Sequence, residues 1–129
     1  MKINWGRALN AGLVAEILLL LIYEFVVRLY GRGLVTSVIV IGGSFVFMLL
    51  GALWVGRKIE SRFILHGFLV GVMAIAYYVI RSLPVVFDGE YPMNYWLAAL
   101  YGHTPKLLGG IVGGYIAGRL RKKAPIANQ

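Results

Sequence analysis

Long apolar stretches separated by short polar segments dominate the pattern of this chain. Three of them cover about residues 8–29, 34–56 and 63–87. Each has the roughly 17 to 25 residues that an α-helix needs to cross the ~30 Å hydrocarbon core of a bilayer. The pattern therefore predicts three membrane-spanning helices, followed by a fourth apolar region that begins at Tyr91.

The fourth apolar region is interrupted by Thr104 and Pro105. Threonine is a good N-cap, and proline is well suited to the first position of a helix, which predicts a last span over about 105–121. The aromatic segment at about 91–102 is then predicted as a short helix lying at the membrane interface. The alternative is a single long helix kinked at Pro105, because membrane helices tolerate proline.

The composition supports a membrane protein of the all-α class. Hydrophobic residues make up 60% of the 129 residues and charged residues 14%, whereas soluble domains are nearer half apolar and a quarter charged. We therefore expect an all-α, polytopic protein in the cell (inner or cytoplasmic) membrane, with one four-helix domain over residues 1–123. Residues 124–129 are predicted to form a mobile C-terminal tail.

The distribution of basic residues predicts the orientation in the membrane. The chain has 13 Lys and Arg against 5 Asp and Glu, and positively charged loops stay in the cytoplasm. With four spans, the basic residues on the side shared by both termini are Lys2, Arg7, Arg57, Lys58, Arg62, Arg119, Arg121, Lys122 and Lys123. Both termini are therefore predicted to be cytoplasmic, and the basic excess indicates contact with the lipid bilayer, not with nucleic acid.

Repeated spacings indicate a duplicated helical hairpin. The order and spacing of Arg7, Gly12 and Tyr23 in the first span recur in the third span. A second set, ending in Gly56 and Arg57, recurs at the end of the last span. Two hairpins with the same orientation would be parallel repeats about an axis along the membrane normal.

Glycines at four-residue spacing predict close contacts between helices. In a bilayer, small residues allow helix backbones to approach each other. The glycines assigned to such faces are Gly67, Gly71, Gly110, Gly114 and Gly118. The spacing leaves open whether the partner helix belongs to the same chain, to a second copy in a homo-oligomer, or to another membrane subunit.

Glu16 is an ionisable residue deep inside the first predicted span. No acid or base lies three or four residues from it, and a buried carboxyl without a cation favours its neutral form. His66 is predicted to lie about one turn shallower on the third span, and Ser44 near mid-depth on the second; either could hydrogen-bond to Glu16. Glu16 and His66 form a candidate intramembrane site for a proton or a cation, with a purely structural carboxyl as the alternative.

A second group of charged residues is predicted near the outer ends of the spans. Glu24 lies one helical turn before Arg28, while Arg81 and Lys106 are placed at a similar level by their distance from the span ends. Charged groups within spans are costly unless paired. These four residues are therefore predicted to form an outer ion-pair cluster.

The residues reveal no catalytic constellation, and none of the ligand patterns of a metal or a cofactor site. We therefore expect a protein without enzymatic activity and without a cofactor. The leading hypothesis is a subunit, or an assembly or scaffold factor, of a membrane complex that acts through glycine-mediated helix contacts. The alternative hypothesis is a small oligomeric transporter or channel for protons or cations that uses Glu16.

Overall fold

The protein consists of four α-helices connected by short segments. The structure, a computed structural model, describes residues 3–87 and 93–123. The helices are α1 (Trp5–Tyr30), α2 (Leu34–Gly56), α3 (Phe63–Phe87) and α4 (Met93–Lys123). No strand occurs in these two ranges, so the prediction of an all-helical protein is confirmed, while the predicted tail at 124–129 lies outside the described residues.

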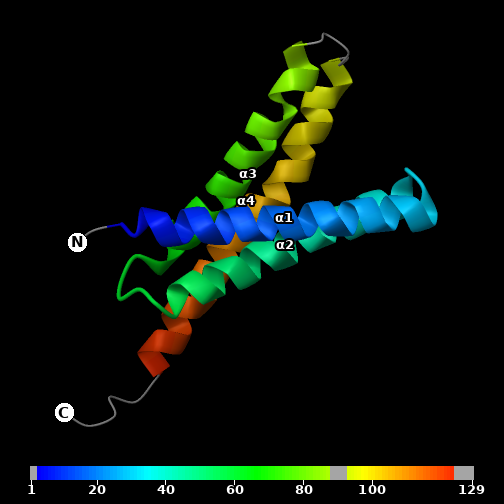
Figure 1. The fold of residues 1–129 in the computed structure, drawn as a ribbon. Helices are drawn as coiled ribbons and strands as arrows, with labels where there is room; N and C mark the ends of the chain where they lie inside the picture. Colours follow the sequence, from blue (N-terminus) through cyan, green and yellow to red (C-terminus); the bar gives the residue numbers. More distant parts are fainter. Residues whose placement is uncertain (1–2, 88–92, 124–129) are drawn as a thin grey trace, which may run out of the picture.

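The helices form two hairpins that cross each other (Figure 1). Helix α1 packs against α2, and α3 packs against α4; the hairpins meet where α2 and α3 contact each other and where α1 contacts α3 and α2 contacts α4. The hairpins lie together at the end that holds the N-terminus and diverge toward the α1–α2 and α3–α4 connections (Figure 1). Within the described residues, no Cα atom of α1 comes within 8 Å of one in α4.

Helix α1 is longer than the first predicted span because both of its ends are capped. The Asn4 side chain accepts a hydrogen bond from the Arg7 amide over 3.3 Å, which satisfies one of the free amides of the first turn. At the other end, the Gly31 amide donates to the Val27 carbonyl over 2.9 Å. Gly31 has a φ of 72°, a left-handed value that glycine adopts without strain.

Helix α4 differs from the prediction because it continues through Pro105. The Thr104 hydroxyl donates to the Leu100 carbonyl one turn earlier over 3.0 Å and does not cap a new helix. Proline removes one backbone hydrogen bond, and the surrounding helix persists here despite that loss. The prediction of a separate short helix before Thr104 and a new helix start at Pro105 was therefore wrong for residues 93–123, and the alternative of one long helix through Pro105 describes α4. Residues 91 and 92 of the predicted interfacial segment lie outside the described residues.

The glycines predicted to pack helices lie where α3 meets α4. They are Gly67, Gly71, Gly110, Gly114 and Gly118. A Cβ atom on Gly67 would overlap the carbonyl oxygen of Gly110, and one on Gly71 would lie 2.7 Å from the carbonyl oxygen of Lys106. The α3 and α4 backbones are thus in direct contact, at a distance that only glycine permits.

A second glycine face of α4 lies against α2. A Cβ atom on Gly109 would overlap the Phe45 carbonyl oxygen, and one on Gly113 would lie 2.5 Å from the Leu49 carbonyl oxygen. Both glycine faces of α4 therefore have partners within the same chain. This answers the question that the glycine spacing alone left open.

Large apolar side chains lie on the surface, and small ones fill the interior. The buried core contains several alanines of α1, α2 and α3 around Met48, Val55 and Val70. Exposed residues include Phe25 at 63% and Leu34 at 80%. Exposed large apolar side chains occur on all four helices, which indicates a surface that is covered in the native environment.

Two of the helices are long and apolar enough to cross a membrane. They are α2, over Leu34–Gly56, and α3, over Phe63–Pro84. Together with the exposed apolar residues of the other helices, this finding supports an association with a membrane.

Candidate functional site

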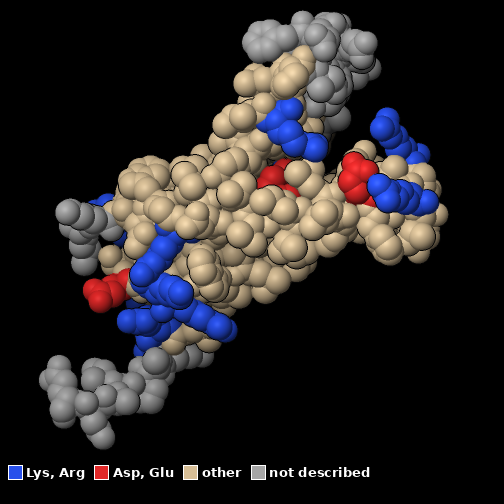
Figure 2. Space-filling model, in the orientation of Figure 1, with Lys and Arg blue, Asp and Glu red and all other residues tan. Residues whose placement is uncertain are grey.

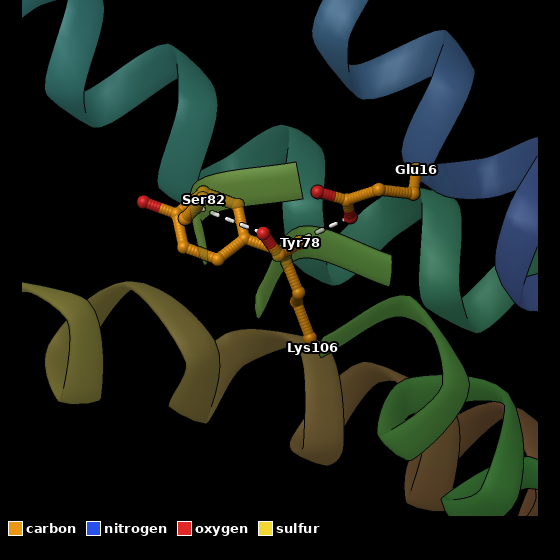
Figure 3. Close-up of polar contacts among 4 residues, drawn as sticks. All are labelled: Glu16, Tyr78, Ser82 and Lys106. Carbon is orange, nitrogen blue, oxygen red and sulfur yellow. Dashed lines mark hydrogen bonds and ion pairs between the residues drawn. The ribbon is translucent and has the colours of Figure 1, made fainter. Parts of the chain in front are cut away.

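A buried ion pair connects the first helix of the chain with the last. The Lys106 ammonium on α4 lies 2.6 Å from the Glu16 carboxylate oxygen Oε2 on α1. Each side chain is only 4% exposed. Figure 3 shows the lysine extending from α4 past Tyr78 of α3 toward the glutamate. The pair therefore spans the gap between two helices whose backbones do not touch.

The position of Lys106 follows from its contact with α3. Because Gly71 has no side chain, the backbone of α4 at Lys106 can lie directly against α3. The lysine side chain then reaches α1 alongside α3, with its ammonium 5.1 Å from the centre of the Tyr78 ring. A cation at this distance from an aromatic face is attracted to the ring, so Tyr78 helps to hold the ammonium near Glu16.

The stability of the buried ion pair depends on a balance between the cost of desolvation and the attraction of the two charges. Moving each ion out of water costs several kcal/mol, and the attraction between the two charges offsets that cost only when the geometry is good. The 2.6 Å contact between the charged atoms provides the close approach that such an attraction needs. Either residue alone would leave an uncompensated charge in an apolar interior.

A polar cleft opens directly beside the ion pair. Its volume is about 600 Å³, within the range of sites that bind small molecules. It lies between α1, α3 and α4, next to the α1–α2 connection, and its polar lining consists of Glu16, Tyr23, Glu24, Arg32, Tyr78, Arg81, Ser82 and Lys106. Figure 2 shows acidic surface where the two hairpins diverge and basic surface on both arms.

Charge is unevenly distributed in this cleft. Glu16 and Lys106 neutralise each other at its buried side, whereas Glu24, Arg32 and Arg81 are exposed. Two guanidinium groups therefore face the cleft against one free carboxylate. The Ser82 hydroxyl, which donates to the Tyr78 carbonyl over 2.8 Å, adds a neutral polar group to the wall.

The predicted outer ion-pair cluster is not formed as expected. In residues 3–87 and 93–123, the ion pair between Glu16 and Lys106 is the only one, so Glu24, Arg28 and Arg81 have none. Lys106 was placed near the outer end of a span because that span was expected to begin at residue 105. In the continuous helix α4 (Met93–Lys123) it lies near the middle, at the depth of Glu16.

His66 lies in another part of the molecule and does not bond to Glu16. Its Nε2 atom accepts a hydrogen bond from the Asn4 amide over 3.0 Å, and its Nδ1 atom lies 2.9 Å from the Arg62 carbonyl. An imidazole that accepts at Nε2 and donates at Nδ1 is neutral. His66 therefore joins the start of α1 to the start of α3, which is a structural role.

The partner of Glu16 was missed because sequence spacing reveals only local pairs. Residues three or four apart share a helix face, but Glu16 and Lys106 are 90 positions apart. The usable signal was an acid in the first predicted span and a base in the last, each without an oppositely charged residue three or four positions away. Opposite charges in that situation stabilise each other.

Comparison with known proteins adds no further assignment to this geometry. No family model, no curated protein sequence and no solved structure matches the chain. Within the described residues, no three His, Asp or Glu side chains cluster in a way that could hold a metal ion. The chemistry of the cleft is therefore that of its charged and hydroxyl-bearing side chains.

Proposed function

We propose that the chain is a multi-pass membrane protein that carries a small anion through the cleft beside Glu16 and Lys106. In this proposal all four helices span the membrane. The opposite charges of Glu16 and Lys106 neutralise each other inside the protein, which lowers the cost of placing α1 and α4 in lipid. The two hairpins then have the same orientation, as expected for parallel repeats.

The orientation follows from the basic residues at the ends of the helices. The α2–α3 connection carries Arg57, Lys58 and Arg62, and the last turns of α4 carry Arg119 and Arg121. Figure 2 shows basic surface gathered at this end of the molecule. By the preference of positive loops for the cytoplasm, the termini are cytoplasmic in this proposal, and the cleft opens at the opposite face of the membrane.

The observation that carries the function is the buried ion pair at the inner side of a charged cleft. Ionisable residues inside membrane-spanning segments are costly to insert, and they mark solute and ion pathways in membrane proteins. An ion pair with a purely structural role does not need a cleft beside it. Here a cleft of about 600 Å³ is lined by both residues of the pair. A solute can therefore reach the pair from the open side.

The charges of the cleft favour an anion as the transported solute. They do not favour the proton or cation of the transporter hypothesis that the sequence suggested. Lys106 already neutralises Glu16, so the carboxylate is not a free cation site. The exposed groups are Arg32 and Arg81 against Glu24. Guanidinium groups bind carboxylates and phosphates through paired hydrogen bonds, which suits a small carboxylate or phosphate compound.

The scaffold hypothesis gains no support from the glycine faces. Gly110 and Gly114 face α3, and Gly109 and Gly113 face α2, so these faces are occupied within the chain. A role as a subunit of a larger complex, like a homo-oligomer, stays a prediction that would have to use other surfaces.

Transport and binding can be tested with the purified protein in liposomes. Currents on a solid-supported membrane should appear after addition of acetate, succinate or inorganic phosphate, and not after exchange of sodium for potassium. Arg81→Gln should weaken the response to the active anion by at least about tenfold, because hydrogen bonds to charged groups contribute about 1.5–3 kcal/mol.

Arg28→Gln is the matched control for this experiment. Arg28 lies at the same end of α1 as the cleft and is exposed, but it does not line the cleft. The control should respond like the unaltered protein. Equal losses in both variants, or currents carried by cations alone, would contradict the proposal.

A further inference from the structure

A second cavity lies between α3 and α4 at the opposite end of the molecule from the charged cleft. It is a groove of about 660 Å³ next to the α2–α3 connection. The lining residues that matter here are the apolar Phe63, Phe68 and Ile111 and the basic Arg62, Arg119 and Lys122. We call it the α3–α4 groove.

The floor of the α3–α4 groove is apolar. Phe63, Phe68 and Ile111 provide aromatic and aliphatic surface. A Cβ atom on Gly118 would lie only 3.3 Å from the Phe63 ring. Because glycine has no side chain, the groove keeps space here that a larger residue would partly fill. A flexible hydrocarbon chain fits a floor of this kind without leaving polar groups unpaired.

The rim of the α3–α4 groove is basic at one end. Arg62, Arg119 and Lys122 are all exposed, and no acidic residue is among the described residues that line the groove. Arg119 is held in place by Tyr115: its Nε donates to the tyrosine hydroxyl over 3.0 Å, and its guanidinium carbon lies 5.3 Å from the ring centre. Its terminal nitrogens remain available to a ligand.

We propose that the α3–α4 groove binds one molecule of an anionic phospholipid. An acyl chain lies along the apolar floor, and the phosphate group meets Arg62, Arg119 and Lys122 at the rim. The charge pattern selects this occupant, because a surface that is apolar along its length and cationic at one end complements an anionic amphiphile. The assignment uses the proposed membrane location but not the transport activity.

The position of the groove agrees with this occupant. The basic rim lies at the end of the protein that the proposed orientation places in the cytoplasm, at the level of the lipid headgroups. Basic side chains near an anionic membrane surface contribute about 1 kcal/mol each. Binding in the groove differs from this general electrostatic attraction because Arg62, Arg119 and Lys122 all line one cavity.

Native mass spectrometry of the whole protein, released from nanodiscs that contain equal amounts of phosphatidylglycerol and phosphatidylcholine, tests the proposal. One phosphatidylglycerol molecule should stay bound in preference to phosphatidylcholine. Arg119→Gln and Lys122→Gln should each reduce the retained phosphatidylglycerol by about fivefold, the ratio that corresponds to about 1 kcal/mol.

Arg121→Gln supplies the matched control. Arg121 lies between the two test residues on α4, is exposed and carries the same charge, but it faces a different cavity, beside Gly56 and Ala117. The control should retain phosphatidylglycerol like the unaltered protein. Equal loss in all three variants would show a general surface attraction, and equal retention of the two lipids would show an apolar contact without headgroup recognition; either result overturns the proposal.

Discussion

The ion pair of Glu16 and Lys106 makes a quantitative prediction about stability. Replacing either residue by methionine removes one charge and leaves the other buried at a site that is 4% exposed. An uncompensated buried charge costs about 3–5 kcal/mol. Glu16→Met and Lys106→Met should therefore each lower the free energy of unfolding by about that amount.

The double variant should behave differently from the sum of the single ones. With both residues replaced by methionine, no charge is left in the interior, and the flexible thioether side chains can fill the space. Buried ion pairs can often be replaced by apolar residues at little cost. We expect the double variant to lie within about 1–2 kcal/mol of the unaltered protein, so the two substitutions would be strongly non-additive.

Unfolding by sodium dodecyl sulfate in mixed micelles, followed by far-ultraviolet circular dichroism, measures all four proteins under the same conditions. The double-mutant cycle then gives the coupling between positions 16 and 106. If the double variant loses the sum of the two single effects, the residues act independently. In that case the ion pair does not link α1 to α4, and the proposed role of Glu16 and Lys106 in the site is refuted.

Two further predictions concern helix contacts. Gly109→Ala should destabilise the protein by about 1–3 kcal/mol, because its Cβ would overlap the Phe45 carbonyl oxygen. Gly42→Ala is the control, because nothing lies within 4 Å of a Cβ atom at this position, and it should raise stability by about 0.5–1 kcal/mol. Thermal unfolding in detergent compares the two variants. Equal effects would refute the contact assigned to Gly109. His66→Leu should cost about 1–3 kcal/mol, since it removes the acceptor of a backbone amide. Faster amide hydrogen exchange in the first turn of α1, with α4 unchanged, would support this, and unchanged exchange would argue against it.

Uninterrupted apolar runs were sufficient to locate two helices. The bounds of α2 and α3 are those of the second and third apolar segments, because no competing local signal occurs within either run except Pro84 near the end of α3. In α4, Thr104 and Pro105 together resemble a helix start. The choice between a start and a continuation depends on the packing of the α4 glycines against α2 and α3, which local sequence does not contain.

Predicting the site from the sequence would also have required knowledge of contacts between distant parts of the chain. Sequence alone indicated that Glu16 is unusual, but it assigned Lys106 to a different depth because of the expected start of the last span. The cleft also depends on the angle between the two hairpins, because Arg32 of the α1–α2 connection and Arg81 of α3 both line it. A crossing angle is set by the contacts between helices, and these contacts have no local signature.

The separation of the two charges along the chain has a consequence for biogenesis. At about 5–20 residues per second, a ribosome needs about 5–20 s to reach Lys106 after Glu16, so Glu16 is synthesised well before its counter-charge exists. For a chain inserted as proposed, α1 must wait for α4 before its glutamate is neutralised. Assembly is thus completed by the last helix, and a nascent chain that ends before it carries an unpaired acid.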